Sequence, residues 1–213
     1  MSEDTLTVES QALEPSSVGA LAEEAVYQLP GCSDLMVRKA LQRVFREYCR
    51  ATGSLVCRSS RTVSSTSPAI ALCSQYGDFY LLTGASLDDV EVDIRDLRPY
   101  AENGMPKVTF ADSISGTASV EAVVTFSVIP RIGSDIAPYN WLNRHGDAIV
   151  SGMLAELMAE NGRPWFNPAA AVENSRKYWM HKQNYAFMRL SAGSRDGNMT
   201  FTDDRYSFAG SFG

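Results

Sequence analysis

Apolar side chains recur at the spacing of a helix between residues 33 and 52. One face of that helix would carry Val37, Ala40, Leu41, Val44, Phe45 and Tyr48. Ser33 is suited to cap the start of the helix, and Gly53 is suited to end it. The pattern therefore predicts a helix over residues 33–52.

The spacing changes between residues 55 and 130, where apolar and polar side chains alternate instead. Candidate strands lie at 69–73, 79–83, 90–94 and 120–128. Turn signals rich in Gly, Asn and Pro lie at 77–78, 103–106 and 115–116. We expect five to six antiparallel strands in this region.

Helical spacing returns at residues 139–161, where a stripe of small residues runs beside an apolar stripe. The small residues are Ala148, Gly152, Ala155 and Ala159. Small side chains let another backbone approach closely, so we interpret this stripe, together with the nearby Trp165, as a helix-packing surface. Asn161 and Gly162 would end the helix.

A last helix is predicted over residues 167–191, with Asn167 as its cap and Pro168 at its first position. Its apolar face would carry Val172, Ser175 and Trp179. The remaining segments lie at the two ends of the chain. Residues 1–28 are expected to form a flexible or partly helical extension, and residues 193–213 a tail rich in Gly and Ser.

These elements together predict an α+β fold. Three to four helices would form a small bundle within a domain spanning 29–192, with an antiparallel β domain inserted at 55–130 and an extended C-terminal tail. The tail carries more aromatic and basic side chains than a plain linker: Arg195, Phe201, Arg205, Tyr206, Phe208 and Phe212. It could fold back on its own domain or bind another chain; we expect the second, because four buried rings would contribute several kcal/mol (each about 1.5–3 kcal/mol).

Composition narrows the possible functions. The 213 residues carry a net charge of −6 and a pI of about 5.0, so bulk attraction to nucleic acid is not expected. The first ten residues lack the apolar core of a secretory signal, and no run of 18 apolar residues suggests a membrane span. The four cysteines form no CxxC pair, and with only two histidines we expect reduced thiols and no metal or cofactor.

The search for catalytic residues gives weak candidates. His145 lies on a predicted helix without a carboxylate partner on its face, which favours a partly buried helix residue over a general base. Glu156 and Glu160 share one helix face, as a solvated pair or as the acid/base pair of a cell-wall hydrolase. No nucleophile elbow, P-loop or dinucleotide fingerprint occurs, so we expect no catalytic residue.

A basic stripe follows the first long helix, at Lys39, Arg43, Arg46 and Arg50. It could be a solvated face, a surface for an acidic partner or neighbouring subunit, or a contact to DNA. The last alternative is the weakest, because no aromatic residues interleave with the cations.

Several motifs resemble those of head-to-tail adaptor proteins of tailed bacteriophages. They are LPGCSD at 29–34, VRKA at 37–40, FREYCR at 45–50, GRPWFNP at 162–168 and the segment 201–208. The resemblance covers residues 29–57 and 118–213; the middle β region does not share it.

The resemblance implies a structural protein of the virion neck, assembled in the host cytoplasm. Such proteins bind below the portal as a ring, usually of twelve copies, and genomic DNA passes through the ring without specific binding. The C-terminal segment would reach the portal, and the β insertion would face a further neck or tail protein. Alternatives are another neck or tail-completion component, a cell-wall hydrolase, or a DNA-binding module.

Overall fold

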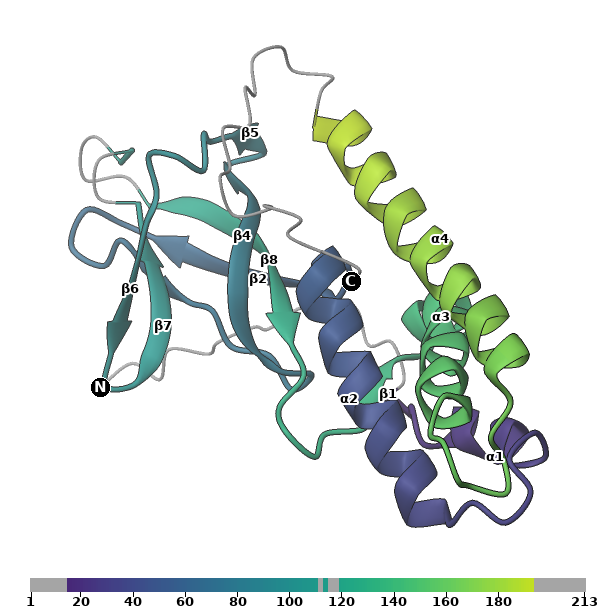
Figure 1. Cartoon of the computed structure of the whole chain (residues 1–213). Coiled ribbons are helices and arrows are strands. Elements are labelled where there is room, and N and C mark those ends of the chain that lie inside the picture. The colour runs from purple at the N-terminus through teal and green to yellow at the C-terminus, as the bar shows by residue number, and fades with distance from the viewer. Residues whose placement is uncertain (1–14, 111–112, 115–118, 194–213) are drawn as a thin grey trace.

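The computed structural model describes residues 15–110, 113–114 and 119–193 of an α+β protein (Figure 1). The helices of this part are α1 (Ala20–Val26), α2 (Asp34–Thr52), α3 (Tyr139–Met158) and α4 (Pro168–Gly193). The strands are β1 (Pro15–Ser17), β2 (Val56–Val63), β3 (Ala69–Ala71), β4 (Asp78–Leu87), β5 (Val90–Glu91), β6 (Arg98–Glu102), β7 (Met105–Thr109), β8 (Val120–Ile129) and β9 (Ile136–Pro138).

The ends of α2 follow from its caps. The Ser33 hydroxyl accepts a hydrogen bond from the Met36 backbone N–H at 3.4 Å, which satisfies one of the free amides of the first turn. Gly53 takes the left-handed conformation, with φ of 59°, and donates its N–H to the Cys49 carbonyl. The helix predicted at 33–52 corresponds to α2.

The other two predicted helices correspond to α3 and α4 with shifted ends. Helix α3 ends at Met158, three residues before the predicted end, and Gly162 turns the chain with φ of 80°. The Asn167 side chain accepts a hydrogen bond from the Ala170 backbone N–H at 3.1 Å and so starts α4. That helix continues to Gly193.

The strands form antiparallel sheets. One has the order β2-β8-β4-β5 and another the order β3-β7-β6, while β1 pairs only with β9. Strand β8 lies inside the larger sheet, and Val124, Phe126 and Val128 on it are fully buried. Asn103 and Gly104 take positive φ at the tight turn between β6 and β7, as expected for an Asn-Gly hairpin.

The strand predicted at 90–94 is wrong beyond its first two residues. Asp88 and Asp89 reverse the chain with positive φ, and the returning strand covers Val90 and Glu91, followed by one more backbone hydrogen bond from Val92 to the Ala85 carbonyl at 2.9 Å. Ile94 accepts a hydrogen bond from the Leu97 amide at 3.3 Å and lies in a turn. The described part of 55–130 holds seven strands, more than the five to six expected, because β2 and β6 lack clear alternation.

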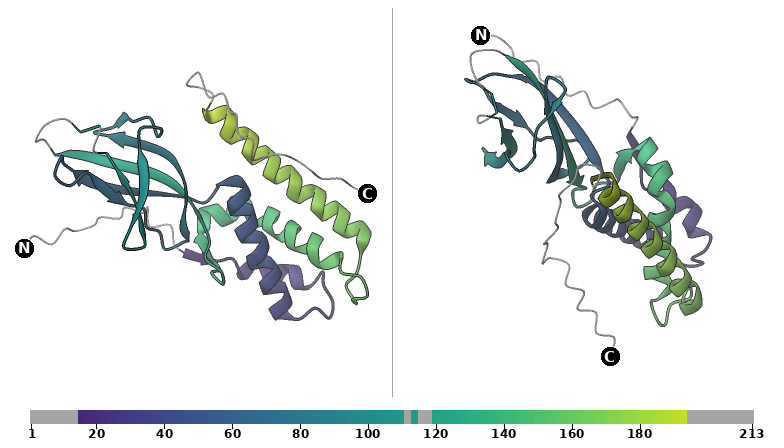
Figure 2. Two further views of the ribbon diagram at one scale, coloured as in Figure 1. Left: turned by 60° about the vertical axis from the view of Figure 1, so that its left-hand side comes forward. Right: turned by 90° about the horizontal axis from the view of Figure 1, so that it is seen from above.

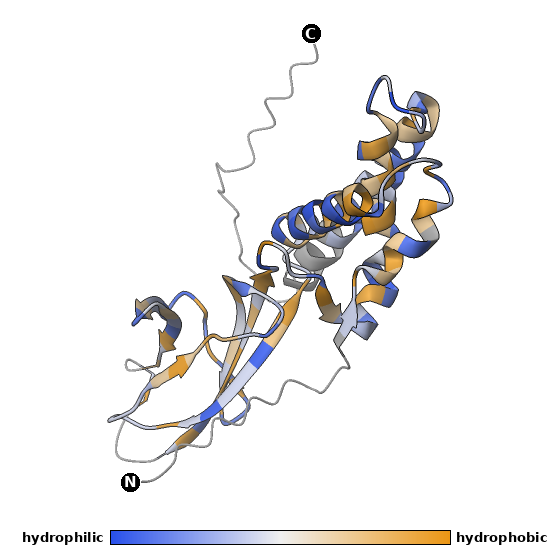
Figure 3. Cartoon of the chain, turned by 90° about the horizontal axis from the view of Figure 1, so that it is seen from below, coloured by the Kyte–Doolittle hydropathy of each residue, from blue (hydrophilic) through white to orange (hydrophobic). Residues whose placement is uncertain are grey.

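The helices pack together at one end of an elongated molecule, and the large sheets lie at the other (Figure 2). The C-terminal end of α2 lies next to the sheets, and a continuous set of buried apolar side chains runs through both parts. Each helix and strand carries both hydrophobic and hydrophilic residues, as expected of amphipathic elements that bury one side (Figure 3).

The segment expected to be an N-terminal extension contributes to this core from residue 15 onward. Val18, Ala25 and Leu29 are fully buried, and α1 packs against α2 and α3. The described residues before Leu29 are therefore part of the folded body. Their apolar side chains lie at helical spacing, but a seven-residue helix gives only a weak sequence signal.

Candidate functional site

Gly152 lies where three helices meet. A Cβ atom built on Gly152 of α3 would lie 2.6 Å from Val44 Cγ1 on α2 and 2.9 Å from Tyr178 Cδ2 on α4. Both distances are shorter than real Cβ contacts, so only glycine fits at this position without a shift of its neighbours. The absence of a side chain lets α2 and α4 approach α3 on the same face.

The other members of the small-residue stripe differ in burial. Ala148 is fully buried, Ala155 is half-buried, and Ala159 is exposed at the end of α3. Trp165 is buried in the connection to α4, with the guanidinium carbon of Arg163 5.7 Å from its ring centroid. Close approach between helices thus depends on the middle of the stripe rather than on its end.

An aromatic cluster surrounds His145 on α3. Its Nδ1 atom lies 3.0 Å from the Tyr48 hydroxyl oxygen, and the rings of Trp141 and Tyr185 pack against it. Burial, reinforced by the positive charge of Arg144, lowers the pKa of His145 to about 4. The imidazole is therefore neutral near pH 7 and shares a hydrogen bond with the hydroxyl of Tyr48, whose own pKa is raised by burial. This pair forms a polar contact within the helix core.

The cations of the basic stripe on α2 are all exposed, but two of them have partners within the chain. Arg43 forms an ion pair with Glu156 on α3, with Nε 3.1 Å from Oε2. Arg46 donates a hydrogen bond from Nε to the Pro130 carbonyl at 3.1 Å. Lys39 and Arg50 have no hydrogen-bond or ion-pair partner among the described residues.

Helix α4 turns a different face to the protein than its sequence pattern predicts. Ala171 and Tyr178 are buried, whereas Val172 is 71% exposed and Trp179 is 43% exposed. The predicted face at Val172 and Trp179 is wrong as the packed face, because α4 carries apolar side chains on both sides and periodicity does not rank them. The Tyr178 hydroxyl decides the orientation by donating to the Glu47 carboxylate of α2 at 3.4 Å.

Lys182 links the two sides of α4. Its ammonium forms an ion pair with Glu47 at 3.0 Å and lies 4.4 Å from the centroid of the Trp179 ring. A cation placed over an indole face is attracted to it. Trp179 is therefore held in position while part of its ring stays exposed, next to Met180, which is 52% exposed.

The carboxylates considered for hydrolysis are both engaged with arginine. Glu156 pairs with Arg43, and Glu160 pairs with Arg163 at 3.3 Å. Each carboxylate therefore has its own arginine partner at the surface of the helices.

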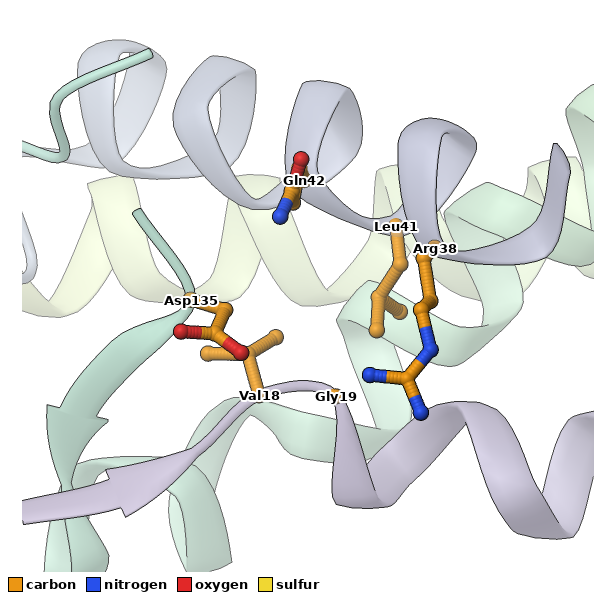
Figure 4. Close-up of a pocket in the computed structure, with 6 residues that line it drawn as sticks. All are labelled: Val18, Gly19, Arg38, Leu41, Gln42 and Asp135. Carbon is orange, nitrogen blue, oxygen red and sulfur yellow. The ribbon is translucent and has the colours of Figure 1, made fainter. Parts of the chain in front are cut away.

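A small hollow lies beside the first two helices. A hollow between α1, α2 and the segment before β9 has a free volume of about 10 Å³, roughly that of one water molecule (Figure 4). It is lined by Val18, Gly19, Arg38, Leu41, Gln42 and Asp135. No group of three or more His, Cys, Asp or Glu side chains in the described part could hold a metal ion.

The sequence analysis did not identify the acidic surface that begins at Asp88 and Asp89. Residues 88–96 contain five exposed carboxylates: Asp88, Asp89, Glu91, Asp93 and Asp96. Arg95 is the single cation of this segment, which leaves four negative charges. We call residues 88–96 the acidic turn; five carboxylates within nine residues could have revealed it.

The predicted partner-binding residues of the tail lie outside the described residues. They are Arg195, Phe201, Arg205, Tyr206, Phe208 and Phe212. Their proposed contact with a portal therefore stays a prediction from the sequence.

No family model matches the chain, and no curated protein matches it. Among the described helices, none combines the length and the apolar character that crossing a membrane requires.

Proposed function

We propose that the chain is a structural subunit of the neck of a tailed bacteriophage. It forms a ring, of twelve copies by its resemblance to adaptor proteins, that joins the portal to the tail and extends the DNA channel. In this proposal the helices are the ring body, strands β2 to β8 are an inserted domain that faces a further neck protein, and residues 193–213 reach the portal. The proposed location is the virion neck, after assembly in the host cytoplasm.

The exposed apolar face of α4 is the observation that carries the proposal. Val172, Trp179 and Met180 lie on a helix whose opposite face is already packed on α3 and α2. Exposed apolar side chains that gather on one element are typical of a protein interaction surface. The same helix leads into the segment that we expect to bind the portal.

The net charge supports the channel part of the proposal. A charge of −6 disfavours tight binding to the DNA backbone, and a channel must let DNA slide. The motifs at 29–34 and 162–168 resemble those of adaptor proteins and therefore favour an adaptor over another neck component. They precede α2 and α4, the two helices that meet α3 at Gly152.

A cell-wall hydrolase receives less support from the geometry. Glu156 and Glu160 each pair with a different arginine, and His145 is buried against Tyr48. The hollow lined by Arg38 and Asp135 has room for about one water molecule, and neither glutamate lines it.

Co-sedimentation with portal rings of the same phage tests the proposal. We expect the full chain to sediment with the portal, and the chain lacking residues 193–213 to stay folded by circular dichroism but to remain in the supernatant. A variant with Phe201, Tyr206 and Phe208 changed to Ser is the matched control of full length, and we expect it to behave like the truncated chain. The proposal is wrong if the full chain does not bind portal rings, or if the purified chain degrades peptidoglycan.

A further inference from the structure

Two exposed surfaces of opposite charge lie in different parts of the molecule. The outward face of α2 presents Lys39, Arg43, Arg46 and Arg50, while the acidic turn follows β4 and contains β5. Figure 1 shows β5 at the end of the β part that lies away from α2. Among the described residues, no ion pair joins the acidic turn to the basic stripe.

The acidic turn is held in a fixed shape. Asp88 and Asp89 occupy left-handed conformations, and the Asp88 carboxylate accepts a hydrogen bond from the Glu121 amide of β8 at 2.7 Å. Asp93 accepts a hydrogen bond from the Arg95 amide at 2.9 Å. These bonds use two of the five carboxylates to hold the turn, and the other three remain available at the surface.

The basic stripe is similarly divided. Arg43 and Arg46 contact Glu156 and the Pro130 carbonyl within the chain, and both side chains remain exposed. Lys39 and Arg50 lie on the same face, one toward each end of the helix. The two outer cations of the stripe therefore have no partner among the described residues, and the two cations between them contact other groups of the same chain.

We propose that the exposed face of α2 binds the acidic turn of a second copy of the chain. The contact joins two different surfaces, so each copy offers one surface to each of its two neighbours. Such head-to-tail contacts close into rings or continue as filaments. The proposal that the contact closes a ring rests on the proposed function; the contact itself does not.

The charges of the two surfaces match this arrangement. A turn with four net negative charges would face a helix with four cations, and complementary charges select the partner and orient it. Ion pairs at a solvent-exposed rim contribute little each and are screened by salt, with a Debye length of about 8 Å at 0.15 M salt and about 3 Å at 1 M. We therefore expect weak, salt-sensitive self-association that a scaffold such as a portal ring would strengthen.

Sedimentation velocity of charge variants of the full chain tests the contact. One variant neutralises the stripe with Lys39→Glu and Arg50→Glu, which leaves two acidic and two basic side chains on it. A second neutralises the turn with Glu91→Lys and Asp96→Lys, which leaves three acidic and three basic side chains there. A third carries all four changes and keeps the parent net charge of −6. The positions avoid Asp88, Asp93, Arg43 and Arg46, whose side chains have partners within the chain.

The parent should show a sedimentation coefficient that rises with protein concentration at 50 mM salt and does not rise at 500 mM salt. Each two-site variant alone should stay monomeric, because one of its two surfaces no longer carries a net charge. The two variants mixed should associate at a 1:1 ratio through the unchanged stripe of one and the unchanged turn of the other. The four-site variant should stay monomeric although its net charge equals that of the parent. A matched control, Arg58→Glu with Arg98→Glu on exposed positions of β2 and β6, lowers the net charge by the same four units as the stripe variant and should still associate.

The inference is overturned if the parent stays monomeric at both salt concentrations, if the two mixed two-site variants fail to associate, or if the control loses association as well. The contact and the proposed function can fail independently of each other. If the parent self-associates as described but does not bind portal rings, the contact stands and the neck function fails. If both two-site variants still form complete rings on the portal, the neck function stands and this contact is refuted.

Discussion

Adding a side chain at Gly152 should separate helices that the native sequence lets touch. The change Gly152→Ala places a methyl group 2.6 Å from Val44 Cγ1 and within about 3 Å of two carbons of the Tyr178 ring. Val44 is a β-branched residue on a helix and has one strongly preferred rotamer, and both neighbours are buried. Neither can move away without shifting α2 or α4.

The expected magnitude is a balance of two effects. Alanine is favoured over glycine inside a helix by about 1 kcal/mol, whereas overpacking of a well-packed core costs about 1–3 kcal/mol. We therefore expect Gly152→Ala to lower the free energy of unfolding by about 1 kcal/mol. Gly152→Leu adds three more carbon atoms at the same point and should lower it by about 3 kcal/mol.

A double-mutant cycle isolates the contact with α2. The change Val44→Ala removes the atom nearest to the new methyl group, but it also leaves a small cavity. The destabilisation caused by Gly152→Ala should therefore be smaller in the Val44→Ala background, with a coupling energy of about 1 kcal/mol. The contacts with Tyr178 remain, so the relief should be partial.

Urea unfolding monitored by circular dichroism provides the measurement, with the midpoint shifting and the slope unchanged. Ala159→Leu is the matched control, because it adds bulk to the same stripe at an exposed position and should change stability by less than about 0.5 kcal/mol. The reasoning fails if Gly152→Leu is as stable as the parent, or if the Val44→Ala background leaves the cost of Gly152→Ala unchanged.

Three further outcomes follow from the site. The pKa of His145 is about 6.5 in the unfolded chain and about 4 in the folded chain, so the free energy of unfolding should be fully retained above pH 6.5 and fall by up to about 3 kcal/mol as the pH drops to 4. His145→Gln should flatten this slope in urea titrations at a series of pH values. Replacing Glu156 and Glu160 together by Gln should leave particle assembly unchanged in a complementation assay, and a loss of lytic activity on peptidoglycan gels would instead indicate a hydrolase. Gel shifts with duplex DNA should show no complex at 150 mM salt, and a retained complex there would favour a DNA-binding module.

The long helices could be predicted because their ends are encoded locally. Ser33, Gly53 and Asn167 act within a few residues of themselves, and the structure gives each of them its expected capping role. The face of α4 could not be predicted in the same way. Its orientation depends on the contact of Tyr178 with Glu47, which is 131 residues away in the chain.

The strands were harder to predict, since alternation reports only that one side is buried. Val90 and Val92 alternate with acidic residues, yet the chain turns at Asp88 and Asp89, bonds back to β4 only as far as Val92, and turns again from Asp93. Positive φ at an aspartate cannot be inferred from hydrophobic spacing. The same turn creates the acidic surface, so the failure of the strand prediction and the missed surface have one cause.

A candidate site residue could be predicted where its role depends on the size of its side chain. It could not be predicted where its role depends on which distant residue it pairs with. Gly152 could be singled out from the small-residue stripe, because close helix contact requires a small side chain at a fixed spacing. The ion pair of Arg43 with Glu156 joins residues 113 positions apart, and nothing in the spacing of the stripe indicates it. The stripe was therefore identified, but the division between engaged and available cations was not.

The packing at Gly152 also explains how α4 can present an apolar face to a partner. Tyr178 fills the space beside Gly152 and donates to Glu47, and Lys182 pairs with the same carboxylate while lying over Trp179. Rotation of α4 that would bury Trp179 would pull Tyr178 out of the junction and break both contacts with Glu47. The exposure of Trp179 is thus a consequence of the most tightly packed point of the helices, and a partner that covers this face would bind a surface that is already in place before association.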